Sequence, residues 1–208
     1  MIETLPLLQR LALSYAPAAT RVPLLALLVL DARLAGIVRG SREPMLAQLR
    51  LAWWREQLGA GSVSLGGNDP LLALLQSWPG PTPVLAGLSD GWEAMTGPAP
   101  LPDAAFLTLA GARAAAFAAL AEGPDALRMG RNWALADIAG HLGDPRERAA
   151  ALALARGQDW RQARLPRALR PLAVLHGLAA RTIWRDNPAM MPSPGATLAA
   201  MRIGLLGR

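Results

Sequence analysis

Apolar and polar residues follow each other along the chain with the three- and four-residue spacing of amphipathic helices, in blocks that proline and glycine separate. Residues that favour strands are sparse, whereas alanine, leucine and arginine, which favour helices, are abundant. The pattern predicts an all-α fold in a single domain over residues 1–208, with helices at 4–15, 21–39, 42–58, 69–77, 83–96, 103–121, 124–142, 145–156, 165–184 and 195–206.

The helix boundaries rest on residues that start or stop helices. Thr20 is the predicted N-cap of the second helix, which Gly40 ends. Ser41 is the predicted N-cap of the third helix, whose first turn tolerates Pro44. The segments 58–67 and 187–195, rich in glycine or proline, are predicted loops.

The segment "MLAQLRLAWWREQL" at 45–58 is apolar on both broad faces of a helical wheel. This pattern predicts a mostly buried helix, with Trp53 and Trp54 buried on different sides. Arg50 and Glu56 then point inward and need partners or a wet cavity. Two interpretations remain open: an internal Arg–Glu pair that holds the bundle together, or a polar lining for a ligand cavity.

Composition narrows the class of protein. A chain of 208 residues that is 52% hydrophobic and 17% charged is not disordered. It contains no cysteine, which excludes disulfides and thiolate chemistry. The net charge is +6, and all 21 basic residues are arginine. A GC-rich coding bias produces such a preference for arginine over lysine. The charge is therefore weak evidence for nucleic acid, and no nucleic-acid-binding motif is found, so no nucleic-acid partner is expected.

The apolar run at 22–30 is interrupted by Asp31 and Arg33 before it reaches the ~20 residues of a membrane span. The first residues also lack the basic region of a signal peptide. We expect a cytoplasmic location, with a peripheral association with the inner membrane left open.

The region 14–58 resembles the N-terminal part of the squalene/phytoene synthase family, the head-to-head isoprenyl diphosphate synthases. The family pattern is an aromatic residue, a proline, an arginine, a long apolar helix and a helix with a Trp-Trp-Arg core. "LAGLSDGWEAM", "LTLAGARAAAFAALAE" and "NWALADIAGHL" resemble later family helices, and the resemblance thins after about residue 145. The matching residues of the first region are Tyr15, Pro17, Arg21, Arg50, Trp53, Trp54 and Arg55.

The resemblance implies an isoprenoid synthase type of helical bundle with its C-terminal part shortened. It also implies a cavity in which aspartates on two facing helices would bind Mg²⁺. The residues expected to line such a cavity are Tyr15, Arg21, Asp31, Ala35, Arg39, Arg50, Trp53, Trp54 and Glu56.

Both aspartate motifs depart from the family pattern. The first falls at "LAGIVR", where Ala35, Gly36 and Arg39 stand in place of the ligands, and Asp31 one turn earlier is a single carboxylate. The second retains only Asp137, His141 and Asp144. Asp137 and Asp144 are either residual metal ligands or ordinary acids on a helix surface. His141 is either a catalytic base or a residue with a surface or capping position. We expect no metal, no cofactor and no catalytic residue.

A non-enzymatic branch of the family, an assembly factor for respiratory complex I, also lacks the aspartate motifs. The leading hypothesis is therefore a catalytically degenerate family member that acts as an interaction or assembly factor with a protein partner. The alternatives are a transferase with residual activity on isoprenoid diphosphates and a non-catalytic isoprenoid or lipid binder. A basic run contains arginines 156, 161, 164, 167 and 170; it is a solvated face, or it binds anionic lipid, diphosphate or an acidic protein.

Overall fold

The computed structural model describes residues 2–41, 43–59, 69–185 and 193–207. Within these ranges every regular element is a helix, which confirms the predicted all-α class. Three short 3-10 helices are η1 (Ile2–Thr4), η2 (Ala94–Thr96) and η3 (Arg167–Leu169). The α-helices are α1 (Leu7–Leu13), α2 (Ala18–Gly40), α3 (Pro44–Gly59), α4 (Pro70–Leu75), α5 (Pro83–Glu93), α6 (Asp103–Ala118), α7 (Ala126–His141), α8 (Pro145–Arg156), α9 (Arg170–Ala180) and α10 (Pro194–Leu206).

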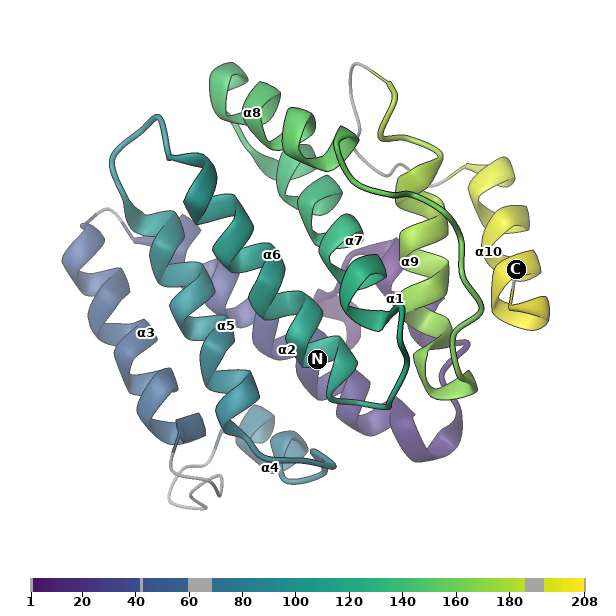
Figure 1. The fold of residues 1–208 in the computed structure, drawn as a ribbon. Coiled ribbons are helices and arrows are strands. Elements are labelled where there is room, and N and C mark those ends of the chain that lie inside the picture. Colours follow the sequence, from purple (N-terminus) through teal and green to yellow (C-terminus); the bar gives the residue numbers. More distant parts are fainter. Residues whose placement is uncertain (1, 42, 60–68, 186–192, 208) are drawn as a thin grey trace.

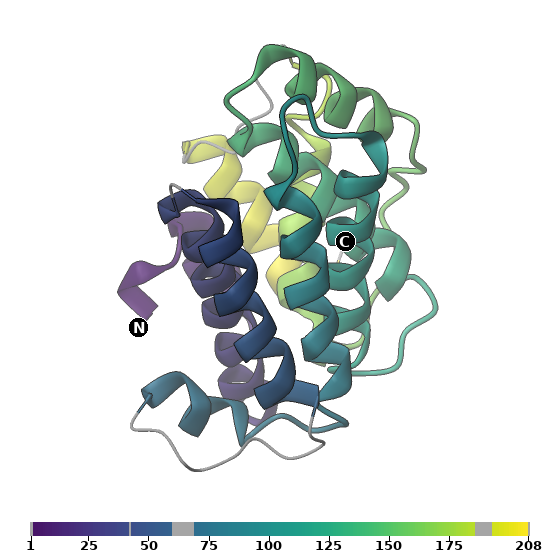
Figure 2. The same ribbon diagram turned by 90° about the vertical axis from the view of Figure 1, so that its left-hand side faces the viewer.

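Six helices lie side by side in the order α3, α5, α6, α7, α9 and α10, and each packs against its neighbours in this row (Figure 1). Helix α2 crosses behind the row and contacts α1, α3, α4 and α5. The view turned by 90° shows α4 and α8 at opposite ends of the bundle (Figure 2). The arrangement places α2, α6 and α7 around one interior region, where the charged side chains described below meet.

The close approach of α6 and α7 depends on small residues. A β-carbon at Gly130 of α7 would lie 2.9 Å from the Cα atom of Ala114 in α6, so a larger residue would push the helices apart. Beside this contact, the rings of Phe117 and Trp133 pack edge to face with their centroids 5.3 Å apart. The contact fixes the position of Arg113, which precedes Ala114.

Both predicted N-caps are wrong, and the helices predicted from residues 4 and 165 begin later, at Leu7 and Arg170. Helix α2 begins at Ala18, because Pro17 already has the extended backbone of an N-cap and the residues after it turn into helix at once. Thr20 therefore lies inside the first turn. The Ser41 hydroxyl donates a hydrogen bond back to the carbonyl of Ile37, so it satisfies the end of α2. Helix α3 begins at Pro44.

The prediction that α3 is mostly buried is also wrong. One face packs on the bundle through Ala47, Leu51, Trp54 and Leu58, and Trp54 is only 3% exposed. The opposite face is open to solvent, where Trp53 is 45% exposed. The error has a physical reason. The helical wheel shows that both faces are apolar, but it does not show whether another helix covers each face, because this depends on the whole fold.

Most of the predicted loop at 58–67 and part of the loop at 187–195 lie outside the described residues. None of the helices in the described ranges has both the length and the hydropathy that a membrane crossing requires.

Candidate functional site

A buried arginine joins two helices through their carboxylates. Arg113 of α6 binds Asp31 of α2 with two nitrogens, Nε at 3.0 Å from Oδ1 and the second terminal nitrogen at 2.8 Å from Oδ2. Its other terminal nitrogen donates to Oδ2 of Asp137 in α7 at 3.0 Å. The three side chains are at most 10% exposed, and one guanidinium binds both carboxylates. We call this set the Arg113 cluster.

Two tryptophans complete the Arg113 cluster. Trp92 donates its indole N–H to Oδ1 of Asp31 at 2.8 Å. The rings of Trp92 and Trp133 lie with their centroids 5.2 and 5.5 Å from the guanidinium carbon of Arg113, within the range of cation–π attraction. Burial lowers the pKa of Arg113, but the carboxylates of Asp31 and Asp137 outweigh this effect and raise the pKa above its ordinary value. The guanidinium therefore remains charged.

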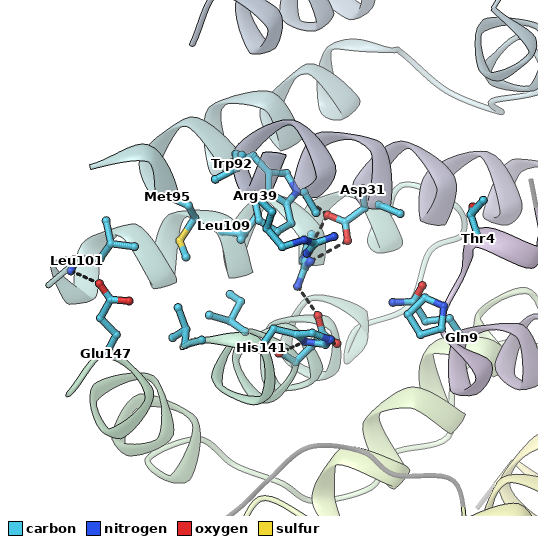
Figure 3. A pocket seen from close by; sticks show the side chains of 18 residues that line it. Thr4, Gln9, Asp31, Arg39, Trp92, Met95, Leu101, Leu109, His141 and Glu147 are labelled. Carbon is cyan, nitrogen blue, oxygen red and sulfur yellow. Dashed lines mark hydrogen bonds and ion pairs between the residues drawn. The ribbon is translucent and has the colours of Figure 1, made fainter. Parts of the chain in front are cut away.

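The Arg113 cluster lies beside a cavity of about 420 Å³, a size typical of small-molecule sites. Figure 3 shows its lining residues extending from Leu101 and Glu147 at one end to Thr4 and Gln9 at the other. Apolar side chains supply most of the wall between these ends. They are Ala32, Ala35, Val38, Met95, Leu109, Ile138 and Leu142.

Five of the residues predicted from the sequence line this cavity. Asp31 and Ala35 lie on its α2 side, and Asp137 and His141 lie on its α7 side. Arg39 also lines the cavity; its side chain is solvent-exposed and forms no ion pair with the described residues. His141 Nδ1 donates to the backbone carbonyl of Asp137 at 2.7 Å, so the ring is held against the preceding turn of α7.

The predicted lining residues on α3 do not line this cavity. Trp54 packs into the core, and Trp53 faces solvent. Arg50 and Glu56 are exposed, which rules out both interpretations made for them from the sequence. Instead, Arg55 forms the ion pairs of this helix, with Asp90 and Glu93 of α5.

Three other predicted site residues also lie elsewhere. The ring of Tyr15 occupies the space beside Gly204 of α10, where a β-carbon would come into steric conflict with it. Arg21 is exposed and donates to the carbonyl of Ala16. Asp144 caps α8 by accepting a hydrogen bond from the backbone N–H of Arg146. This capping role accounts for an aspartate at position 144 without any role as a metal ligand.

The sequence reasoning missed the residue that organises the site. Arg113 is the one charged residue between Asp103 and Glu122, in an otherwise alanine-rich helix. A lone arginine in an apolar helix is a signal for a buried ion pair, because such a charge needs partners. Glu147 was also missed; it is buried and accepts a hydrogen bond from the backbone N–H of Leu101 at one end of the cavity.

The carboxylates of the cluster are largely engaged within the protein. Both oxygens of Asp31 and Oδ2 of Asp137 interact with Arg113, and Oδ1 of Asp31 also accepts from Trp92. In the described part of the chain, histidine, aspartate and glutamate side chains form no cluster of three that could hold a metal ion. The cavity offers mostly apolar walls and the side chain of Arg39, which forms no ion pair with the residues that the structure describes.

Comparison of the chain with protein-family models, curated proteins and solved structures finds no match.

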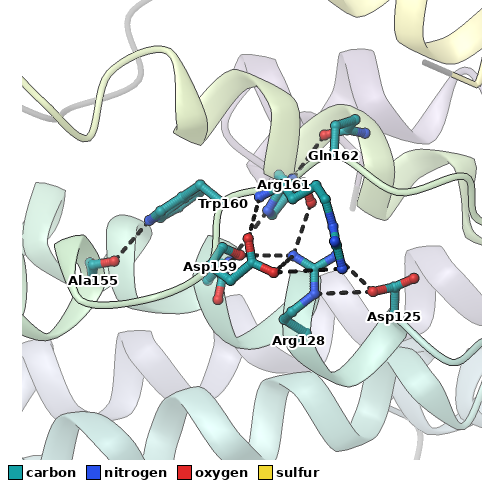
Figure 4. Close-up of polar contacts among 9 residues, drawn as sticks. Asp125, Arg128, Ala155, Asp159, Trp160, Arg161 and Gln162 are labelled. Atoms are coloured by element: carbon teal, nitrogen blue, oxygen red, sulfur yellow. Dashed lines mark hydrogen bonds and ion pairs between the residues drawn. The ribbon is translucent and has the colours of Figure 1, made fainter.

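A second polar cluster, partly exposed to solvent, holds the non-helical segment before η3 against α7 and α9 (Figure 4). Arg128 of α7 donates to the backbone carbonyls of Asp159 and Arg161 at 2.8 and 2.9 Å. Arg128 also binds the carboxylate of Asp125. Trp160 donates its indole N–H to the carbonyl of Ala155. These contacts fix the backbone of the segment, so we assign this cluster a structural role.

His176 of α9 is fully buried in the second cluster. Its Nδ1 lies 2.9 Å from Oε1 of Gln162, and its Nε2 lies 3.5 Å from the amide nitrogen of Asn132. The neutral ring with its proton on Nδ1 satisfies both neighbours, and its face stacks on Trp160. Burial and the positive charge of Arg128 lower the pKa of His176 to about 4, while the carboxylates of Asp159 and Asp125 oppose this shift.

We predict a loss of stability in mild acid that depends on His176. The unfolded histidine binds a proton below its ordinary pKa of ~6.5, whereas the folded one resists protonation until its pKa of about 4. The free energy of unfolding should therefore fall by about 3 kcal/mol between these two pH values. Urea unfolding of the wild type and His176→Gln across this window measures the difference, because glutamine does not titrate.

The variant His141→Gln is the matched control, since its ring is largely exposed. It should keep the pH dependence of the wild type. A wild-type curve parallel to that of His176→Gln would contradict the prediction.

Proposed function

We propose that the protein is a non-catalytic relative of the squalene/phytoene synthases, of the isoprenoid synthase fold type, which binds a ligand without converting it. The observation that carries the proposal is the position of Arg113 between the carboxylates of Asp31 and Asp137. These aspartates project from α2 and α7. The resemblance implies that the metal-binding aspartates of the synthases also lie on two facing helices, in the positions that α2 and α7 would take here.

A guanidinium in this position opposes metal binding by electrostatics. At ~4 Å a dication and a guanidinium repel each other by about 8 kcal/mol at an effective dielectric of 20. Both carboxylates are compensated internally by Arg113, so they offer little attraction to offset this repulsion. Metal-assisted ionisation of a diphosphate is therefore unsupported at this site, which disfavours the residual transferase.

The cavity suits a ligand with an apolar body and an anionic group. Its walls are mostly apolar, and Arg39 supplies a cation that makes no ion pair within the described parts of the chain. An arginine side chain binds a phosphate or carboxylate through two parallel hydrogen bonds. The resemblance makes isoprenoid diphosphates the first compounds to test.

We predict that farnesyl and geranylgeranyl diphosphate release no diphosphate in the presence of the protein and Mg²⁺ beyond a control without protein. Binding of farnesyl diphosphate, measured by calorimetry, should be equal with Mg²⁺ and with EDTA. Arg39→Ala should weaken it roughly tenfold, because a charge-assisted hydrogen bond is lost. Arg50→Ala, on the exposed face of α3, is the matched control and should bind like the wild type.

Two results would overturn the proposal. Diphosphate release that requires Mg²⁺ and disappears in Asp137→Asn would identify a transferase. Equal affinity of the wild type and Arg39→Ala would show that the cavity does not bind the anionic group as proposed.

An interaction or assembly role is the second candidate, and the exposed face of α3 favours it. Leu46, Leu49 and Trp53 are exposed at the three- and four-residue spacing of a helix–helix seam, with Met45 beside them. Glu43, Arg50 and Glu56 surround this face with charges of both signs. We propose an amphipathic helix of a partner protein as the occupant, because mixed charges suit a protein surface better than anionic lipid.

Affinity purification from the native host tests this role by comparing variants. Leu46→Ser combined with Leu49→Ser should lose a specific protein that the wild type retains, because the apolar contact is removed. Leu198→Ser combined with Leu205→Ser, on α10, is the matched control and should retain it. Identical sets of captured proteins from all three would contradict the role.

A further inference from the structure

The positive charge of the chain is concentrated at one end. Residues 160–208 contain eight arginines and a single acidic residue, Asp186, whereas residues 1–159 contain thirteen arginines and fourteen acidic residues. The C-terminal quarter therefore carries +7, and the remainder carries −1. A coding bias toward arginine explains the use of arginine but not this uneven distribution.

The same region exposes an apolar helix face. Helix α10 packs on α9 and α1 through Ala199, Ala200, Ile203 and Gly204. Its outer face carries Leu198, Met201, Leu205 and Leu206, which are between 47% and 68% exposed. Arg202 is exposed between them, and the helix contains no acidic residue. Figure 1 shows α10 at the edge of the row of helices, beyond α9.

Arginines lie next to both ends of α10. At its C-terminal end, a β-carbon placed on Gly207 would lie 3.9 Å from Cγ of Arg164. At its N-terminal end, Arg181 and Arg185 line a small hollow together with Ser193 and Ala196. None of these arginines forms an ion pair with the described residues.

An exposed tryptophan lies next to these arginines in the sequence. Trp184 is 63% exposed, whereas Trp78, Trp92 and Trp133 are buried. In the sequence it lies between Arg181 and Arg185, which follow α9 and line the hollow at the N-terminal end of α10. Tryptophan is enriched at the level of the lipid headgroups in membrane-bound proteins, where arginine and leucine can accompany it.

We propose that the outer face of α10, with Arg164, Arg181, Arg185, Arg202 and Trp184, docks on a membrane surface that contains anionic lipids. The leucines and Met201 enter the boundary between headgroups and acyl chains, and the arginines bind lipid phosphates. This surface is distinct from the cavity, so the inference does not depend on the proposed ligand. The leucine-rich stripe favours a bilayer over nucleic acid, whose backbone offers no apolar layer.

Vesicle co-sedimentation tests the docking surface. The full chain is mixed with vesicles of phosphatidylcholine alone or with about 30% phosphatidylglycerol, a composition that supplies the negative surface potential. We expect binding to the anionic vesicles only, decreasing as salt is added. Leu198→Ser combined with Leu205→Ser should lower the partition constant at least roughly tenfold, because apolar burial is lost.

Arg164→Gln combined with Arg202→Gln should lower the partition constant roughly tenfold as well, since each arginine near the surface contributes to it. Both arginine side chains are exposed, so their replacement should leave the fold intact. This pair therefore tests the electrostatic contribution to vesicle binding even if the leucine variant fails to fold. The matched controls are Leu46→Ser with Leu49→Ser on α3 and Arg50→Gln with Arg131→Gln, also exposed sites. Both controls should bind like the wild type.

The proposal is overturned by equal binding to the two vesicle types or by absence of binding to either. Equal losses in the test and control variants would also overturn it, because the surface would then not be specific to α10. Binding of a DNA or RNA duplex in place of anionic vesicles would assign the arginines to nucleic acid instead.

Discussion

The ion cluster around Arg113 is the interaction on which the interior of this protein depends. A single guanidinium, nearly inaccessible to water, holds Asp31 of α2 and Asp137 of α7 and contacts the rings of Trp92 and Trp133. A buried charge is costly without partners, so these side chains constrain one another and the helices that carry them. The two carboxylates are thereby neutralised within the fold, and Arg39 lines the cavity beside them.

The three proposals concern separate surfaces of the molecule. The cavity beside the Arg113 cluster is lined mostly by apolar side chains, while α3 and α10 expose apolar faces at the two ends of the row of helices. The faces differ in charge: α3 carries acidic and basic residues, whereas α10 itself carries an arginine and no acidic residue, and Arg181 and Arg185 line the hollow at its start. This difference in charge is the physical reason for assigning a protein partner to one face and an anionic bilayer to the other.

The sequence predicted the helices well because proline, glycine and apolar spacing are local signals. Helix α8 at 145–156 matches the prediction, and α7 and α10 differ from it by a residue or two. Which apolar face would be covered is not a local property, and this is why Trp53 and Glu56 were placed in a cavity that they do not reach.

The candidate site was predicted only in part. Asp31 and Asp137 were identified individually, but their common partner was not, because an ion pair between residues 82 positions apart leaves no periodic pattern. The isolated arginine in the alanine-rich stretch 104–121 was the available signal. Reading it would still not have selected its partners, since that choice depends on how α2, α6 and α7 pack.

A double-mutant cycle between Arg113 and Asp31 tests the central claim most directly. The free energies of unfolding of the wild type, Arg113→Met, Asp31→Asn and the double variant are measured in urea. If the guanidinium holds the carboxylate in the interior, each single variant leaves a buried partner uncompensated, and the double variant is less destabilised than the two effects added together. The account predicts a coupling free energy of about 1–3 kcal/mol. Additivity within about 0.3 kcal/mol would contradict it.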